Sequence, residues 1–116
     1  MPMTTPQQLL EQLAQQADNI VFADVMAVID SHYDFTASAF DNGAIHNAAG
    51  ENSGSCKVFA FGQLHQLNEL QTLALFGEHY RAVKGNPDGD DHQNIRNFIS
   101  HGWAGIKLNQ SPLAPR

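Results

Sequence analysis

The apolar residues between Phe22 and Tyr33 constrain the fold of this chain more than any other feature of its sequence. They recur at intervals of three and four residues, which places their side chains on one face of an α-helix. The residues with this spacing are Phe22, Val25, Met26, Ile29 and Tyr33. Val21 and Val28 widen the apolar face. We therefore expect this helix to be buried on more than one side and to form a main element of the core.

Two further helices are predicted from their end signals. Thr5 followed by Pro6 is a typical start, with an N-cap residue before a proline at the first helical position, and predicts a helix over about residues 6–17. Asn68 with Gln71 three residues later matches a capping box and opens another helix. We expect that helix to run to Gly85 as a left-handed stop. Its expected inward residues are Leu70, Leu73, Ala74, Gly77 and Tyr80.

The segment from Ser55 to Leu67 contains KVFAF, in which Lys57 precedes the apolar run VFAF. Such a run is compatible with a buried strand. The length of the segment, and the helical spacing of Phe61 and Leu64 from Val58, favour a helix instead.

A last helix is expected after the turn-rich loop GNPDGDD. Asp90 or Asp91 would cap it, and Gln93 would complete a capping box if Asp90 is the cap. Its inward residues are expected to be Ile95, Phe98, Ile99 and Trp103.

A hairpin is predicted where FTASAF and AIHNA flank Asp41–Gly43, since an Asn-Gly pair supplies the positive φ angles of a tight turn. GIKL, residues 105–108, is expected to be a short strand beside it. The sequence thus predicts an α+β fold in which about five helices pack around a small antiparallel hairpin or sheet. The length of 116 residues suits a single domain over residues 1–116. We expect frayed ends at about residues 1–4 and 109–116.

The charges are unevenly distributed. Residues 1–56 contain no Lys or Arg, and the whole chain has a formal net charge of −6. Nucleic acids and anionic membranes are recognised by clustered basic residues, so neither is an expected partner. The acidic first half could instead bind a basic protein. In this hypothesis the chain acts purely by protein interaction. The single cysteine and the absence of a secretory signal pattern indicate a reducing compartment.

Four segments carry a resemblance to a known family. They are YDFTASAF from Tyr33, AAGENSGSCKVFAFGQLH from Ala48, PDGDDHQNIRNF from Pro87 and HGWAGI from His101. In these segments the chain resembles the HopJ type III effector family, over about residues 22–106. The resemblance implies a protein of the bacterial cytoplasm that can be secreted into a host cell by a type III system. It implies no defined activity and no catalytic residues.

Two polar loops, residues 50–56 and 85–92, carry the most unusual residue choices, and each leads into an expected helix. If they lie side by side, two helix N-termini converge on one cleft, which favours an anionic or carbonyl-bearing ligand. A small ligand or a protein partner could bind there. The alternative is that these side chains satisfy backbone groups of the loops. The candidate ligand-binding residues are Glu51, Asn52, Ser53, Ser55, Asp90 and Asp91.

An enzyme is the alternative to a binding protein. Cys56 lies just inside a predicted helix start, where a thiol pKa can be lowered. With His92 as base and Asp90 or Asp91 to orient it, Cys56 could serve a small cysteine-dependent hydrolase or transferase. The other interpretation is a small, buried, unreactive cysteine. The six histidines form no HExxH pattern, and we predict neither a metal nor a cofactor.

Overall fold

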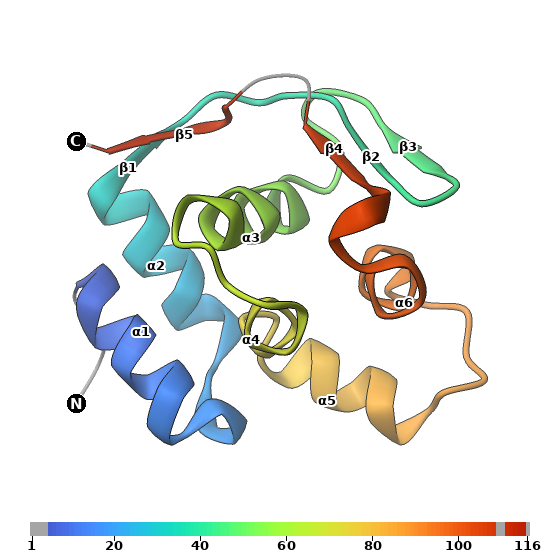
Figure 1. Ribbon diagram of the computed structural model, residues 1–116, viewed down its shortest axis with the longest axis horizontal. Helices are drawn as coiled ribbons and strands as arrows, with labels where there is room; N and C mark the ends of the chain where they lie inside the picture. Colours follow the sequence, from blue (N-terminus) through green and yellow to red (C-terminus); the bar gives the residue numbers. More distant parts are fainter. Residues whose placement is uncertain (1–4, 109–110, 116) are drawn as a thin grey trace.

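A central helix, α3 (Ser53–Leu64), organises the fold, which the computed structural model describes for residues 5–108 and 111–115. In Figure 1, α1 (Pro6–Gln15) and α2 (Phe22–His32) lie on one side of α3, and α6 (Gln93–His101) lies on the other. The strands follow one side of α3, and α4 (Glu69–Ala74) and α5 (Glu78–Gly85) lie on the opposite side. The described residues thus form six α-helices and small antiparallel sheets, which confirms the predicted α+β class.

The core centres on Phe59, which is fully buried on α3. Residues 58–61 of this helix are each at most 3% exposed, so α3 is covered on all sides rather than on one face. This explains why VFAF, residues 58–61, is a continuous apolar run although it is helical. The rings that contact Phe59 come from four other parts of the chain: Phe40, Phe76, Phe98 and Trp103.

The predicted N-cap at Thr5 and the predicted capping box at Asn68 are both present, and Thr5 forms a capping box as well. The Oγ1 of Thr5 accepts a hydrogen bond from the backbone N–H of Gln8, and the Gln8 side chain accepts one from the Thr5 N–H. Asn68 and Gln71 make the same reciprocal pair at the start of α4. Helix α1 ends two residues earlier than predicted, at Gln15, and a 3₁₀ turn, η1 (Ala17–Asn19), follows it.

The predicted single helix from Asn68 to Gly85 is wrong, because Gly77 divides it into α4 and α5. Gly77 has a φ of +60°, and a Cβ there would lie 2.7 Å from the backbone nitrogen of Phe22. The start of α2 therefore packs directly against the glycine backbone. Two details of this prediction are also wrong: Leu70 is 71% exposed, and Gly85 is the last residue of α5 with no positive φ.

The expected cap of the last helix is also wrong. His92 is the N-cap residue of α6, and neither Asp90 nor Asp91 caps it. Ile95 and Phe98 are buried as predicted, whereas Ile99 is 49% exposed. Trp103 lies in a following 3₁₀ turn, η2 (Gly102–Gly105), where its indole N–H donates to the carbonyl of Leu67.

The predicted hairpin is formed by β2 (Phe40–Asn42) and β3 (Ile45–Asn47). Its turn residues are Gly43 and Ala44 rather than Asn42 and Gly43, and among them Gly43 alone has a positive φ. Asn42 is instead a fully buried strand residue. The GIKL prediction is confirmed, since β4 (Ile106–Leu108) pairs antiparallel with β2.

A second sheet joins the two halves of the sequence. Tyr33, expected to end the second helix, begins β1 (Tyr33–Phe35), which pairs antiparallel with β5 (Leu113–Pro115). Leu113 is 3% exposed. The expectation of a frayed end is therefore wrong for residues 113–115, because their backbone is paired and their first side chain is buried. The expected fraying of residues 1–4, 109–110 and 116 lies outside the described residues.

Candidate functional site

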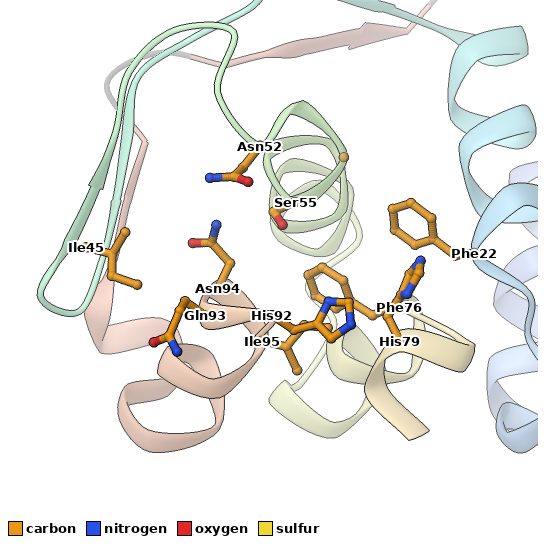
Figure 2. Close-up of a pocket in the computed structure, with 11 residues that line it drawn as sticks. Phe22, Ile45, Asn52, Ser55, Phe76, His79, His92, Gln93, Asn94 and Ile95 are labelled. Atoms are coloured by element: carbon orange, nitrogen blue, oxygen red, sulfur yellow. The ribbon is translucent and has the colours of Figure 1, made fainter. Parts of the chain in front are cut away.

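A pocket of about 410 Å³ lies between the start of α3 and the start of α6. It therefore joins parts of the two polar loops that are some forty residues apart in the sequence. In Figure 2, Asn52 and Asn94 lie on the side of Ile45, and Phe22 and His79 lie on the opposite side, with Ser55 and His92 between. The polar side chains that line the pocket are Asn52, Ser55, His79, His92, Gln93 and Asn94.

The two helices that open onto the pocket begin in the same unusual way. Their N-cap residues, Asn52 and His92, are both left-handed, with φ near +50°. An N-cap residue is normally extended, and its side chain then accepts from the N–H groups of the first turn. Neither Asn52 nor His92 makes such a bond. Their first-turn N–H groups, which carry partial positive charge, are thus left without a cap from these two side chains.

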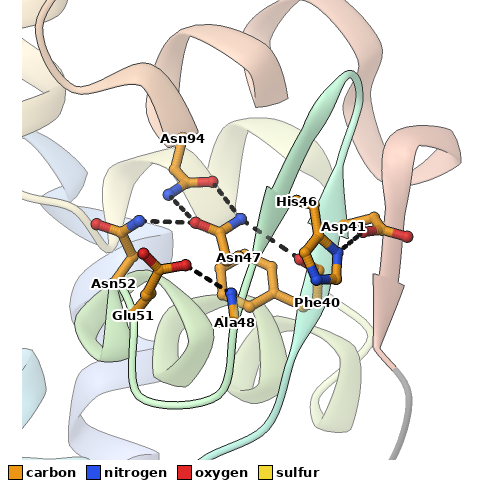
Figure 3. Close-up of polar contacts among 8 residues, drawn as sticks. All are labelled: Phe40, Asp41, His46, Asn47, Ala48, Glu51, Asn52 and Asn94. Atoms are coloured by element: carbon orange, nitrogen blue, oxygen red, sulfur yellow. Dashed lines mark hydrogen bonds and ion pairs between the residues drawn. The ribbon is translucent and has the colours of Figure 1, made fainter.

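A cluster of asparagines holds the two helix starts against the hairpin (Figure 3). The Oδ1 of Asn47 accepts from the side-chain amide of Asn52 at 2.7 Å and from that of Asn94 at 3.2 Å. Asn42 donates to the backbone carbonyl of Asn94 at 2.7 Å. Asn47, Asn42 and Asn94 are all buried. The left-handed turn at Asn52 thus gives up a helix cap and gains a bond that fixes the pocket wall.

Two imidazoles face each other across the start of α5 and the start of α6. The ring centroids of His79 and His92 lie 5.1 Å apart. His79 also meets Phe22 edge to face, with 5.0 Å between the centroids. Among the described residues that line the pocket there is no Asp or Glu, in a chain whose formal net charge is −6. The described lining of the pocket thus carries no carboxylate, although the Glu78 carboxylate lies beside it and accepts from the backbone N–H of Phe22 at 2.8 Å.

The structure places the predicted ligand-binding residues in two groups. Asn52 and Ser55 line the pocket, as does His92 from the enzyme hypothesis. Glu51 and Ser53 instead brace their own loop: the Glu51 carboxylate accepts from the Ala48 N–H at 2.7 Å, and the Ser53 hydroxyl donates to the Gly50 carbonyl. These two contacts match the alternative that the loop side chains satisfy backbone groups.

Asp90 and Asp91 also lie outside the pocket lining. The Asp91 carboxylate pairs with the guanidinium of Arg96 at 2.6 Å, and this bond lowers the pKa of Asp91 below its ordinary value. Arg96 further donates to the backbone carbonyls of Asn86 and Pro87. The carbonyl of Asp90 accepts from the Gln93 side chain. The second loop is thus held onto α6 by Arg96 and Gln93.

Cys56 is buried, with 1% of its surface exposed, and is not among the residues that line the pocket. Its thiol points to the backbone carbonyl of Ser38, at 3.9 Å. Burial raises the pKa of the Cys56 thiol, which disfavours the thiolate needed for nucleophilic attack. His92 faces His79 and is exposed. Cys56 is therefore buried outside the pocket lining while His92 is exposed within it, so the structure does not pair the proposed nucleophile with the proposed base.

Seven of the described lining residues lie outside the two predicted loops: Phe22, Ile45, Phe76, His79, Gln93, Asn94 and Ile95. Phe22 was expected in the core and Ile45 in the hairpin, and Phe76 was not singled out. His79 lies two residues after the unforeseen break at Gly77, so no local pattern indicated that its ring would face another helix start.

Within residues 5–108 and 111–115 no group of three or more His, Cys, Asp or Glu side chains is arranged to hold a metal ion. The helices described there are all too short or too polar to span a bilayer.

Comparisons with known proteins give two matches. The model of the HopJ type III effector protein family matches residues 6–113. The crystal structure of an unknown function protein, VPA0580, superposes on this chain with a TM-score of 0.94. The two sequences are 50% identical, and the match covers 100% of this chain and 97% of the VPA0580 chain. A search of curated proteins finds no match.

Proposed function

This chain belongs to the HopJ type III effector protein family, and we propose that it is a binding protein that takes up a small anionic molecule. The site is the pocket between α3 and α6. One observation carries the proposal: two uncapped helix starts converge on a pocket whose described lining contains no carboxylate.

The first turns of α3 and α6 supply hydrogen-bond donors with partial positive charge. Anions are commonly held in this way at helix N-termini. The hydroxyl of Ser55, the amides of Asn52 and Gln93 and the rings of His79 and His92 add side-chain donors around the same space. An oxyanion can therefore be bound by several donors at once, in a pocket whose described lining contains no Asp or Glu.

The pocket is of a size that suits a small molecule, since ligand pockets measure about 300–1,000 Å³. It is also held in place before any ligand arrives, because the asparagine cluster fixes both helix starts to the hairpin. A preformed site loses less conformational entropy on binding than one that must be ordered.

Binding is favoured over the cysteine-dependent hydrolase or transferase. That reaction needs an accessible thiolate next to a base. Cys56 is 1% exposed, burial raises its pKa, and its thiol contacts a backbone carbonyl instead of an imidazole.

A thermal-shift titration with inorganic phosphate, acetate and larger organic anions tests the proposal. An anion at 100 times its dissociation constant should stabilise the fold by about 2.7 kcal/mol. A neutral isostere of the same anion should give no shift. If no anion stabilises the protein while a host or bacterial protein binds it, the proposal is wrong and the two-loop surface recognises a protein.

Two aspartate variants localise the effect. Ser55→Asp places a carboxylate inside the pocket, and Ser53→Asp places one in the same first turn but outside the pocket lining. Both add acid near a helix N-terminus, which stabilises a helix by about 0.3–1 kcal/mol, so both should remain folded. We expect Ser55→Asp to abolish anion binding and Ser53→Asp to weaken it about threefold or less through screened repulsion. Equal losses in both variants would place the anion elsewhere.

We also propose that the chain resides in the bacterial cytoplasm and is delivered through a type III system, as its family description suggests. A reporter fused to residues 1–25 should be translocated by such a system. A fusion that stays inside the bacterium would remove the delivery proposal and leave the binding proposal unaffected.

A further inference from the structure

The side of the pocket next to the α3 start is aromatic. Phe22 and Phe76 are stacked there, with 6.2 Å between ring centroids and 8° between ring planes. Phe22 is half-buried, whereas Phe76 is buried beneath it. His79 meets the edge of Phe22, and His92 meets His79, so the four rings form a continuous strip along one wall (Figure 2).

This aromatic strip directly adjoins the anion-binding donors. A Cβ at Gly54 would lie 2.9 Å from Cζ of Phe22, so the ring edge rests on the first turn of α3 itself. The next residue, Ser55, lines the pocket. A ligand whose oxyanion reaches the first-turn N–H groups of α3 therefore has the Phe22 ring as its immediate neighbour. In such a ligand the charged group must therefore be attached close to the apolar part that contacts Phe22.

The apolar lining also limits what the body of the ligand can be. Phe22, Phe76, Ile45 and Ile95 offer no side-chain hydrogen bonds, so a polyhydroxylated body such as a sugar would lose its bonds to water against them. A saturated ring or chain would gain from burial alone. A flat aromatic ring gains in addition from stacked and edge-to-face contacts with Phe22 and His79.

We propose that the natural ligand is a small aromatic acid, in which a planar ring is joined directly, or through one atom, to a carboxylate or phosphate. The anionic group lies at the first turns of α3 and α6, and the ring lies against Phe22 and His79. This inference rests on the proposed anion-binding function and names the class of molecule that the same pocket selects.

A matched set of six small molecules, titrated by calorimetry into the full chain, tests the inference. Benzoate and phenyl phosphate carry both features, and cyclohexanecarboxylate keeps the charge and size but not the flat ring. Acetate and inorganic phosphate keep the charge alone, and benzamide keeps the ring alone. We expect the better of the two aromatic acids to bind about tenfold or more tightly than every other probe, since a ring contact and an anion contact are each worth several-fold in affinity. Which of the two binds better distinguishes a carboxylate ligand from a phosphate ligand.

The unfavourable outcomes separate the two levels of the proposal. If acetate or inorganic phosphate binds as tightly as the aromatic acids, the ring preference is overturned and the anion site stands. If benzamide binds as tightly as benzoate, the anion site falls. If none of the six binds, both proposals fail.

Phe22→Leu locates the ring contact, and Phe35→Leu serves as the matched control, because Phe35 is half-buried on β1 outside the pocket lining. We expect Phe22→Leu to reduce the preference for benzoate over cyclohexanecarboxylate to about twofold or less, with acetate binding unchanged. Phe35→Leu should keep the full preference. An unchanged preference in folded Phe22→Leu would overturn the assignment of the ring to this wall. The ligand series with the unaltered protein decides the inference if Phe22→Leu does not fold.

Discussion

Replacing Asn47 with alanine removes the side chain through which the hairpin meets the starts of α3 and α6. Asn47 is 1% exposed, and its Oδ1 accepts two bonds, from Asn52 at 2.7 Å and from Asn94 at 3.2 Å. Its amide donates two longer bonds of 3.4 Å, to the Phe40 carbonyl and to Oδ1 of Asn94. The two shorter bonds are the main loss, because the longer ones are at the limit of useful geometry.

The expected cost follows from these contacts. Each of the two shorter bonds contributes about 0.5–1.5 kcal/mol, and a buried donor left unpaired costs about 1–3 kcal/mol. The donor in question is the Nδ2 of Asn94, in a residue that is 7% exposed. These contributions overlap, so we expect Asn47→Ala to lower the free energy of unfolding by about 2–4 kcal/mol.

Urea denaturation followed by circular dichroism measures this cost, with Asn19→Ala as control. Asn19 is an exposed residue of η1, and its replacement should change stability by less than about 0.5 kcal/mol. The urea midpoint of Asn47→Ala should fall while the slope of the transition stays unchanged. A loss below about 1 kcal/mol, close to that of the control, would refute the reasoning that this cluster holds the pocket together.

Three further outcomes are expected from the structure. Gly77→Ala should destabilise the protein by about 2 kcal/mol or more in the same denaturation assay, because the φ of Gly77 is +60° and a Cβ would meet the Phe22 backbone. Gly85→Ala lies at a helical position where a Cβ would meet no atom within 4 Å, so it should stabilise the protein by about 0.4–1 kcal/mol. A destabilised Gly85→Ala would contradict the helical end of α5. Cys56 should resist iodoacetamide in the folded protein and react after denaturation, because burial both covers it and raises its pKa; rapid alkylation in the native state would contradict this. Burial lowers the pKa of the His65 imidazole in the folded protein below its ordinary value of 6.5, so as the pH falls the unfolded chain binds a proton at His65 before the folded chain does. The free energy of unfolding should therefore decrease as the pH falls below 6.5. In His65→Gln it should decrease less steeply down to about pH 5, and the same slope in both proteins would contradict the assignment.

Local signals in the sequence predicted much of the fold. The N-cap at Thr5 and the capping box at Asn68 depend on residues a few positions apart, and both are present. The helix that carries Val25 and Ile29 was evident from its periodicity, since its core-facing residues follow the helical repeat. Resemblance of several segments to the HopJ family was confirmed by a family match over residues 6–113.

Features that depend on distant contacts were missed. Gly77 breaks a helix because the backbone of Phe22 and Ile20 packs against it, more than fifty residues away in sequence. Pairing of β1 with β5 joins residues about eighty positions apart, and the short apolar segment around Leu113 carries no local sign of it. A helical pattern reveals periodicity but not which distant backbone will interrupt it.

The candidate site was predicted in outline and not in detail. The expected convergence of two polar loops on one surface agrees with a pocket lined by Asn52, Ser55 and His92. The polar character of Glu51 and Asp91 gave no means of separating residues that face a pocket from residues that brace a loop. Both kinds of residue are polar, and only their tertiary partners differ.

An NMR titration of the backbone amides with phosphate or benzoate tests the anion-binding pocket most directly. The account predicts saturable shifts with one dissociation constant at the first-turn amides of both helices, Ser53–Ser55 of α3 and Gln93–Asn94 of α6, with little change in α1. Shifts confined to one of the two helices, or scattered over the surface without saturation, would contradict a shared anion site.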